Sequence, residues 1–397
     1  MSSSKYSSNI NFVSVEYIWV SGADTHHDIR SKVRTLPADK FAAIPDAEFM
    51  KHDDFATVEK LAKLFPLWSF DGSSTGQALC CKGKGENTEI YIQPKRAFIH
   101  PFPFSHGGVT IRTFVVLCEC FLPQLPLVPT QDNTRVLATE VFNKKLDAKP
   151  WFALEQEYVI MDPATGRPYN WPASGFPAPQ GPYYCSNGVN AWGREIAEQH
   201  YAACLAVGIR LSGLNAEVMP AQWEYQVGPC TGIEAGDHAI LARWVLVRLA
   251  GQKGLDISFH SKPVQGDWNG SGMHTNYSTE EMRQAGGMAA IKKAIEVMSP
   301  THPKDVMLYG DDNHLRLTGK HETSDMKKFS FGVGTRHTSC RIPVQAEAEG
   351  CGYYEDRRPS ASADPYLVIS TLFSSSMGIA APALDALKDA KASYQIA

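Results

Sequence analysis

The chain has 397 residues, of which 43% are hydrophobic and 20% charged, with a formal net charge of -4. That length exceeds what one hydrophobic core usually supports, so we expect two domains. The slight acidity argues against a general nucleic-acid or anionic-membrane partner, and no apolar stretch is long enough to span a membrane.

Cysteine usage and the first residues bear on the compartment. The nine cysteines include no C-x-x-C pair, and the adjacent Cys80 and Cys81 are too close for an ordinary structural disulfide. This usage is typical of a reducing compartment. The segment MSSSKYSSNI lacks the apolar core of a signal peptide and the arginines of a transit peptide. We therefore expect a cytoplasmic protein.

The first third of the chain predicts a small, mostly β domain. Residues 1–10 have the composition of a disordered tail, and residues 11–125 that of the domain. Its expected strands, rich in β-branched and aromatic residues, are 13–20, 33–36, 89–92 and 113–119, with a further strand entering the small-residue loop of 66–77. The proline-spaced segment 122–129 resembles a linker.

Residues 130–397 predict a larger domain in which strands and helices alternate. The expected helices are 133–147, 193–207, 234–252 and 382–394, and a strand is expected at 151–161. Apolar residues of 234–252 recur on one face. The Pro/Gly-rich segment 162–185 predicts a long loop. Loops of this length are typical of a lid or a binding loop.

The run Leu211–Cys230 is the most informative stretch. It places Glu217 and Glu224 among apolar, amide and aromatic residues, where an ionised carboxylate needs a partner charge, a metal or several donors. Pro220 forbids a continuous helix or central strand, so the run predicts strand, kink, strand. Taken alone, it also allows buried glutamates held by backbone donors.

Other acids extend this pattern. Glu155 and Glu157 lie two apart on the strand expected at 151–161, so both project from one face and repel each other unless a cation lies between them. His274 follows a glycine-rich stretch, and Glu355 lies in Tyr354-Glu-Asp-Arg-Arg-Pro359. Five carboxylates and one imidazole fit Mg²⁺ or Mn²⁺ better than Zn²⁺, and paired ions of this kind suggest phosphoryl chemistry.

Arginines complete the candidate site. Arg316, Arg336, Arg341 and Arg357 lie close in sequence to these acids and glycines. Each alone would be read as a surface ion pair, but together they favour an anionic substrate. No Walker A motif and no G-x-G-x-x-G fingerprint occurs, so any nucleotide is bound by another scaffold.

These residues resemble those of the glutamine synthetases of the eukaryotic (type II) class. The resemblance runs from about Glu16 to Leu372. It rests on long motifs in the family's order, which are Trp68-Ser-Phe-Asp-Gly-Ser-Ser-Thr-Gly-Gln77, Glu155-Gln-Glu-Tyr158, Pro179-Gln-Gly-Pro-Tyr-Tyr-Cys185, Asn215-Ala-Glu-Val-Met-Pro-Ala-Gln-Trp-Glu224, Asp267-Trp-Asn-Gly270, Leu317-Thr-Gly-Lys-His-Glu-Thr-Ser324 and Tyr354-Glu-Asp-Arg-Arg-Pro-Ser-Ala361.

The resemblance implies an α+β glutamine synthetase fold. An N-terminal β-grasp domain would occupy 11–125, and a C-terminal catalytic domain, a curved antiparallel sheet flanked by helices, would occupy 130–397. It also implies a homo-oligomer of stacked rings, usually a decamer of two pentamers, with active sites between subunits.

By motif match, the resemblance implies a role for each residue of the site. Two or three Mg²⁺ or Mn²⁺ ions per site would be held by Glu157, Glu217 and Glu224 and by Glu155, His274 and Glu355. L-glutamate and its phosphorylated form would be bound by Asn269, Gly270, Arg316, Arg336 and Arg357. ATP, as co-substrate, would lie along Glu224, Asn276, Ser278, Arg283, Arg336, Arg341 and Tyr353.

The implied reaction serves glutamine biosynthesis and nitrogen assimilation. ATP would convert the γ-carboxylate of glutamate to γ-glutamyl phosphate, which ammonia then attacks. Asp71, from the adjacent subunit, would be the base that deprotonates ammonium. Ser74, Tyr184, Glu322 and Arg336 would complete the catalytic set, with Tyr183 as the less favoured neighbour of the ammonium pocket and Glu322 on a closing flap.

Some positions depart from the family pattern. Thr335 and Val344 replace an asparagine and an arginine, and 345–349 is acidic where the family is usually basic. Loss of an arginine near the nucleotide weakens ATP binding by about one to a few kcal/mol if the contact is charge-assisted. Two alternatives therefore remain, a γ-glutamyl ligase for another amine and a catalytically silent ring-forming homologue.

Overall fold

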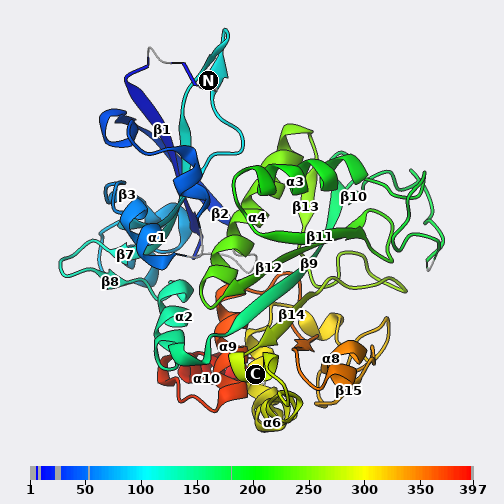
Figure 1. The fold of residues 1–397 in the computed structure, drawn as a ribbon. Coiled ribbons are helices and arrows are strands. Elements are labelled where there is room, and N and C mark those ends of the chain that lie inside the picture. The colour runs from blue at the N-terminus through cyan, green and yellow to red at the C-terminus, as the bar shows by residue number, and fades with distance from the viewer. Residues whose placement is uncertain (1–5, 8–9, 23–27, 52–53, 180, 395–397) are drawn as a thin grey trace. The chain divides into compact units, whose positions relative to one another are not determined.

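The computed structural model describes residues 6–7, 10–22, 28–51, 54–179 and 181–394 (Figure 1). Most of the expected tail at 1–10 lies outside these residues. The chain divides into two compact units, one of Met1–Val136 with Ala202–Ile209 and one of Leu137–Tyr201 with Arg210–Ala397. Both helices and strands build the chain, which confirms the predicted α+β class.

The first unit is a mixed sheet in the strand order β2-β1-β7-β4-β3, with β8 paired to β7. Its central pair, β1 and β7, is parallel, and the other pairs are antiparallel. The elements of the unit are β1 (Phe12–Val20), β2 (Ile29–Pro37), α1 (Phe55–Ala62), β3 (Trp68–Asp71), β4 (Glu89–Ile99), β5 (Ser105–His106), β6 (Val109–Thr110), β7 (Thr113–Leu122) and β8 (Val128–Pro129).

The strands expected at 33–36, 89–92 and 113–119 are longer in the structure, and the largest difference is at β4. The sequence predicted a strand at 89–92 that stops before a proline, but β4 continues to Ile99. Its pairing with β7 shifts register between Pro94 and Arg96. A local irregularity of this kind accommodates a residue that cannot donate to the ladder, so the strand continues past the proline.

The second unit is built on a sheet in the order β11-β12-β9-β14-β17-β16-β15, with β10 and β13 also paired to β9. The pairs are antiparallel, as expected, except that β15 and β16 are parallel. The strands are β9 (Trp151–Asp162), β10 (Arg167–Pro168), β11 (Leu211–Ala216), β12 (Gln222–Thr231), β13 (Asp256–Ser258), β14 (Met273–Ser278), β15 (Phe331–Val333), β16 (Cys340–Ile342) and β17 (Tyr354–Asp356).

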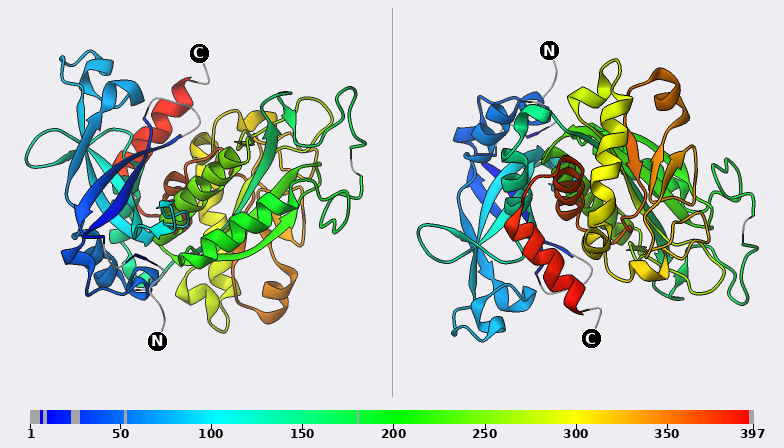
Figure 2. Two further views of the ribbon diagram at one scale, coloured as in Figure 1. Left: turned by 90° about the horizontal axis from the view of Figure 1, so that it is seen from above. Right: turned by 90° about the horizontal axis from the view of Figure 1, so that it is seen from below.

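Helices cover this sheet, and Figure 2 shows α4, α6 and α9 lying together. The helices are α2 (Thr134–Asn143), α3 (Arg194–Ala206), α4 (Glu234–Gln252), α5 (Glu280–Arg283), α6 (Met288–Met298), α7 (His302–Asp305), α8 (Val344–Glu349), α9 (Pro365–Met377) and α10 (Pro382–Tyr394). The helix expected at 133–147 thus ends early. A short 3-10 turn, Leu146–Ala148, follows it.

Helix α4 differs from the one-sided helix that its apolar pattern predicted. It is buried along most of its length, because it packs against β9, β12 and β13 and also against α9. Within the described residues, no single helix is long and apolar enough to cross a membrane, although α9 and α10 pass that test as a pair bent by 110°.

A buried cation on α4 links this helix to the central strand. The Arg243 guanidinium donates twice to Oε1 of Gln156, at 2.8 and 2.6 Å, and to the carbonyls of Ala361 and Ala363 at 2.9 Å. Gln156 in turn donates to the Ala361 carbonyl at 3.1 Å. Because Gln156 lies between Glu155 and Glu157 on β9, this network fixes the strand from the face opposite the two acids.

Replacement of Arg243 tests this network. Arg243→Met removes the donors that Arg243 supplies to Gln156 and to the carbonyls of Ala361 and Ala363, so we expect a loss of about 3 kcal/mol or more in the free energy of unfolding. Arg248→Met, in the more exposed part of the same helix, should change it by about 0.5 kcal/mol. Urea unfolding of both variants measures the difference, and equal losses would contradict the assigned role.

Candidate functional site

Four strands of the second sheet place three sets of acidic side chains and one imidazole in register. Glu224 of β12 lies directly opposite Glu157 of β9, and His274 of β14 lies directly opposite Glu155. On the next strand, Glu355 of β17 lies opposite Asn276 of β14. Directly opposed residues on one sheet face have Cβ atoms about 4.5–5.5 Å apart, so the pairing itself crowds these acids together.

The kink predicted at Pro220 brings in the fifth carboxylate. Strand β11 ends at Ala216 and β12 begins at Gln222, which confirms strand, kink, strand. The turn closes where the Glu217 N–H donates to the Gln222 carbonyl at 2.9 Å, and Ala221 adopts a φ of 67°. Glu217 therefore leaves the strand path and joins the acids on β9 and β12.

The six predicted ligands form two separate groups of three. In each group, three ligand atoms lie within 4.8 Å of one another. The groups are Glu157, Glu217 and Glu224, and Glu155, His274 and Glu355. These are the two sets that the motif match implied.

Amide donors hold the carboxylates of the first group. The backbone N–H of Gly272 donates to Oε2 of Glu157 at 2.8 Å, and Nε2 of Gln222 donates to the same oxygen at 3.2 Å. The Glu217 carboxylate accepts from Nδ2 of Asn215 at 3.2 Å. Sequence analysis did not select these donors, although a signal was present, since amides alternate with the acids along 215–226.

In the first group, burial outweighs the neighbouring positive charge. Burial, opposed by Arg316, raises the pKa of Glu157 to about 7. Burial and then the charge of Glu157 raise the pKa of Glu217 to about 8. Burial and then Glu155 raise the pKa of Glu224 well above its ordinary value. Three buried acids that resist ionisation together have the electrostatics of a site completed by a cation.

The second group combines two acids with a neutral imidazole. Nδ1 of His274 lies 3.4 Å from both Glu155 and Glu355. Burial and then the neighbouring Arg357 hold the pKa of His274 well below its ordinary value. A neutral imidazole is the form that ligates metals, so both groups have the chemistry of divalent-cation sites.

Three arginines lie beside the second group. Nη2 of Arg316 lies 3.0 Å from Nε2 of His274, and Nη1 of Arg357 donates to Glu355 at 2.6 Å. Arg341 also pairs with Glu355 through its Nε. Arg316 and Arg357 are buried, so they are not the surface ion pairs that single arginines suggest.

The predicted flap residue contacts two of the predicted substrate arginines. Glu322 pairs with Nη1 of Arg336, and its backbone carbonyl accepts from Nη2 of Arg357 at 3.2 Å. His321 and Glu322 both adopt positive φ, at 50° and 64°, a conformation that costs non-glycine residues free energy. Asn269 and Gly270 precede β14, and the Gly270 carbonyl accepts from Gln222 at 2.9 Å.

Four of the residues predicted to bind ATP lie in two places. Nδ2 of Asn276 donates to Glu155 at 2.7 Å. Tyr353 is near the same group, since Glu155 and Glu355 contribute, after burial, to the raised pKa of its hydroxyl. Ser278 and Arg283 instead contact each other at 3.0 Å beyond the end of β14, where Arg283 also covers the Trp151 ring at 4.0 Å.

The two candidate tyrosines of the 162–185 segment differ in environment. Tyr183 is 8% exposed and its ring lies 6.2 Å from that of Trp192. Tyr184 is 53% exposed. Burial, Cys185 and then Glu217 raise the pKa of the Tyr184 hydroxyl.

The remaining predicted residues, Asp71 and Ser74, lie in the first unit. Asp71 ends β3 and accepts from the N–H and the hydroxyl of Ser73 at 3.0 and 2.6 Å. These hydrogen bonds lower its pKa, so the exposed carboxylate is ionised and able to accept a proton. Ser74 belongs to the 3-10 turn Gly72–Thr75, which directly follows.

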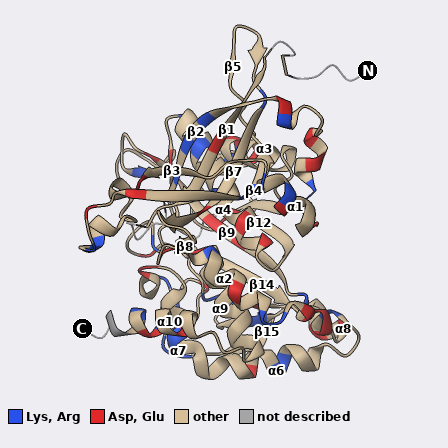
Figure 3. Ribbon diagram, turned by 90° about the vertical axis from the view of Figure 1, so that its left-hand side faces the viewer, with Lys and Arg blue, Asp and Glu red and all other residues tan. Residues whose placement is uncertain are grey.

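The departures from the family pattern have local structural roles. Val344 begins the helix α8, and Figure 3 shows the acidic residues of that helix close to β15. The Thr335 hydroxyl lies 2.8 Å from that of Thr338. Acidic and basic residues are interspersed over much of Figure 3, but β2 carries three basic residues, Arg30, Lys32 and Arg34, and no acidic one.

A further group of ligand-type residues has a different character. Cys230, Glu234 and His238 are clustered and buried where β12 meets α4. His238 lies 3.4 Å and Arg210 3.8 Å from Glu234. The glutamate charge is thus already compensated, so this cluster serves the core.

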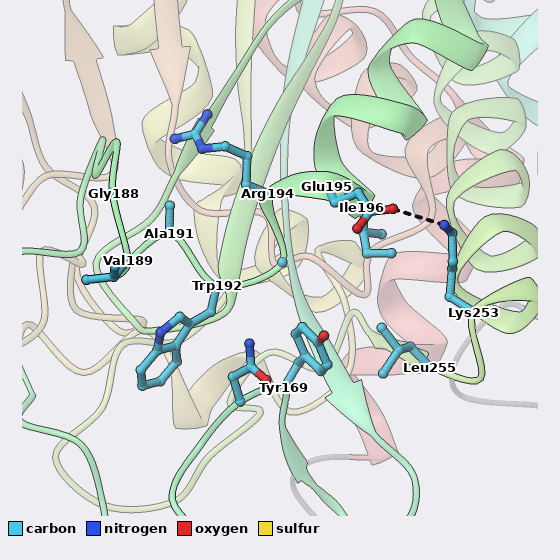
Figure 4. Close-up of a pocket in the computed structure, with 12 residues that line it drawn as sticks. Tyr169, Gly188, Val189, Ala191, Trp192, Arg194, Glu195, Ile196, Lys253 and Leu255 are labelled. Atoms are coloured by element: carbon cyan, nitrogen blue, oxygen red, sulfur yellow. Dashed lines mark hydrogen bonds and ion pairs between the residues drawn. The ribbon is translucent and has the colours of Figure 1, made fainter.

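A cavity of about 460 Å³ lies beside the first residues of α3 and the loop 188–193 that precedes them (Figure 4). Its walls include Tyr169, Trp192, Arg194 and the pair Glu195 and Lys253, whose charged atoms lie 3.1 Å apart. Arg194 donates to the Ser186 carbonyl at 2.5 Å, so one wall supports the loop that follows Tyr184.

The chain is similar to known glutamine synthetases over most of its length. The family model described as glutamine synthetase, catalytic domain, matches residues 133–301. The chain is 47% identical over 364 residues to a glutamine synthetase of Tuber borchii, covering 91% of this chain and 92% of that protein. It is 45% identical to a glutamine synthetase of Neurospora crassa over 91% of each chain. A chloroplastic glutamine synthetase of Brassica napus is 46% identical over 90% of this chain and 76% of its own length.

The raised pKa of Glu217 predicts a pH-dependent stability in the absence of metal. The pKa is raised from 4.5 to about 8 by folding, so the folded state favours the protonated acid. In the metal-free protein, the free energy of unfolding is therefore highest below about pH 4.5, where Glu217 is protonated in both states. It falls as the pH rises to about 8, because the unfolded state releases the proton first. In EDTA, Glu217→Gln should therefore have a higher Tm than the unchanged protein, by a margin that grows between about pH 5 and about pH 8.

Thermal unfolding with and without Mg²⁺ tests this prediction. Excess Mg²⁺ should raise the Tm of the unchanged protein more than that of Glu217→Gln. Glu349→Gln, on the exposed side of α8, is the control and should leave both trends intact. A margin that does not vary with pH would contradict the electrostatics assigned to the first group.

Proposed function

The chain belongs to the glutamine synthetase family, and on that premise we propose that it ligates ammonia to the γ-carboxylate of L-glutamate, converting ATP to ADP and phosphate and producing glutamine. The observation that carries this proposal is the pair of ligand groups on one face of the second sheet. We assign the β-grasp domain to 11–125 and the catalytic domain to 130–397.

The donor set fits divalent cations. Two groups of three, with five carboxylates and one neutral imidazole, favour Mg²⁺ or Mn²⁺, two or three per site. Glu157, Glu217 and Glu224 would hold one ion, and Glu155, His274 and Glu355 another. When bound, such ions neutralise the charge that develops on transferring phosphate oxygens.

Arginines bind and orient the anionic substrate. Arg316, Arg336 and Arg357 bind the carboxylates of glutamate and its phosphorylated form, with Asn269 and Gly270 beside them. The buried guanidinium of Arg316 keeps a fixed geometry, because it donates to the carbonyls of Arg357 and Arg358 at 2.9 and 3.2 Å. Preorganised donors of this kind stabilise charge without rearranging during the reaction.

ATP lies along the other side of the second group. Asn276, Ser278, Arg283, Arg341 and Tyr353 bind it, and Glu224 and Arg336 lie where nucleotide and glutamate meet. The γ-carboxylate oxygen attacks the γ-phosphorus, ADP leaves, and γ-glutamyl phosphate remains. The carboxylate thereby gains a leaving group that ammonia can displace.

Ammonium is bound and deprotonated by a second set of side chains. Asp71, supplied by an adjacent subunit, accepts the proton, and Ser74, Tyr184 and Glu322 line the cation pocket. Glu322 also closes over the intermediate and excludes water, which otherwise hydrolyses it. The pairing of Glu322 with Arg336 supports this closure.

This chemistry requires assembly, because Asp71 and the metal groups belong to different subunits. We propose a homo-oligomer of stacked rings, a decamer of two pentamers, with active sites between neighbouring subunits. We further propose a cytoplasmic location, while noting that plant relatives include a chloroplastic enzyme.

Phosphate release by the purified protein tests the activity. With Mg²⁺, ATP, glutamate and ammonium, we expect phosphate release matched by glutamine. Asp71→Asn should lower kcat on the order of 100-fold to 10,000-fold, as loss of a general base does. Glu217→Ala should abolish turnover, and Asp39→Asn, exposed in the first unit, should not change it.

The same assay separates the alternatives. Turnover only with methylamine, hydroxylamine or a polyamine would assign another amine as substrate. No turnover with any amine, from a protein that still forms rings, would support the silent homologue.

A second prediction concerns the two tyrosines. Tyr184→Phe removes a polar contact to the bound cation, so we expect the KM for ammonium to rise about tenfold with a smaller change in kcat. Tyr183→Phe, buried against Trp192, should leave this KM unchanged. Steady-state kinetics with the ammonium concentration varied measures the KM of both variants. A raised KM in Tyr183→Phe and an unchanged KM in Tyr184→Phe would instead assign Tyr183 to the ammonium pocket.

A further inference from the structure

Two adjacent thiols stand beside the loop that carries Asp71. Cys80 and Cys81 lie in the 3-10 turn Leu79–Lys82, and both are free. Cys80 is half-buried and Cys81 is exposed. Their sulfur atoms lie 3.9 Å apart, so both side chains are directed to the same side of the turn.

This separation matches the distance between two sulfur ligands of one tetrahedral cation that prefers sulfur. A Zn–S bond of about 2.3 Å in tetrahedral geometry places two sulfur ligands about 3.8 Å apart. The two thiols of this chain are therefore already spaced for chelation. Chelation by linked ligands is much stronger than binding to either ligand alone.

The thiols are connected to the proposed base by direct contacts. Sγ of Cys81 lies 3.5 Å from the carbonyl oxygen of Ser73 and 4.0 Å from that of Gly72. Ser73 is also the residue whose N–H and hydroxyl hold the Asp71 carboxylate. The sulfur pair, the Ser73 carbonyl and Asp71 thus form one continuous arrangement within the first unit.

The local charge favours a cation. Partial desolvation, Cys80 and then the negative charge of Asp71 raise the pKa of the Cys81 thiol. A divalent cation reverses this effect, because it stabilises both thiolates and is attracted by the nearby carboxylate. Hard Mg²⁺ does not compete here, since thiolates select soft ions.

We propose that Cys80 and Cys81 bind a soft divalent cation such as Zn²⁺ or Cd²⁺ through two thiolates, next to the Ser73 carbonyl. Each thiol gives its proton to solvent as its bond to the cation forms, so binding releases two protons and involves no redox step. The bound ion ties the turn 79–82 to the loop 72–75. Resting on the proposed function, we infer that this restrains Asp71 and inhibits ligation.

Binding is tested directly with Cd²⁺ on the full-length protein in excess Mg²⁺, which occupies the carboxylates. We expect one Cd²⁺ per chain, seen as a thiolate-to-cadmium charge-transfer band in the ultraviolet. Cys80→Ser should weaken this binding on the order of 100-fold, because only one of two linked ligands remains. Cys185→Ser and Cys351→Ser, which change the other exposed and half-buried thiols, should bind as before.

Inhibition is tested in parallel. Cd²⁺ should suppress glutamine formation by the unchanged protein and by Cys351→Ser, and a dithiol chelator should restore it. Cys80→Ser should keep its basal activity and resist Cd²⁺. Equal Cd²⁺ affinity in Cys80→Ser, or no charge-transfer band in the unchanged protein, would overturn the site. A protein that binds Cd²⁺ but never forms glutamine would refute the proposed function and leave the cation site standing.

Discussion

Crowding of five carboxylates on one face of a single sheet is the constraint on which the second unit depends. Antiparallel pairing sets Glu224 against Glu157 and His274 against Glu155. The contact between Glu224 and Glu157 is unfavourable when both acids are ionised and no cation is present. The surrounding structure must therefore hold the strands in register against repulsion, and it does so with amide donors on the acidic face and a buried guanidinium behind it.

Two layers of donors supply this support. On the acidic face, the Gln222 amide and the Gly272 N–H fix Glu157. On the opposite face, the buried Arg243 holds Gln156, the residue between the two acids of β9. Arg243 is directed to neutral oxygens, so its charge contributes to the field behind the strand without neutralising one particular acid. This arrangement leaves the carboxylates available to bound cations.

The arginines nearest the site, unlike Arg243, lie beside the acids themselves. Arg316 and Arg357 are held by backbone carbonyls and by Glu355, and they lower the cost of burying the acids near them. The same guanidinium groups are the proposed ligands of glutamate. A substrate carboxylate would thus enter a region where positive charge is already oriented, while Glu322 and Arg336, which pair with each other, lie on the more exposed side. In the first unit, by contrast, Asp71 is exposed and accepts hydrogen bonds from Ser73 of its own turn, so its position is more easily altered by what binds beside it.

The sequence alone determined the residue types and many of the elements. Helices at 234–252 and 382–394, the strand at 151–161 and the kink at Pro220 follow from local patterns, because periodicity and proline chemistry act over a few residues. The ligand residues were likewise identified by their unusual placement and by resemblance to a family.

Only the tertiary structure decided which acids meet. Glu217 joins Glu157 and Glu224 because the kink redirects it, and Glu155 joins Glu355 through strands about two hundred residues apart in the chain. The continuation of β4 past Pro94, the parallel pairing of β15 with β16 and the burial of α4 on several sides also escaped prediction. Each of these depends on partners distant in sequence, and a local pattern carries no information about the partner that a strand or helix will meet.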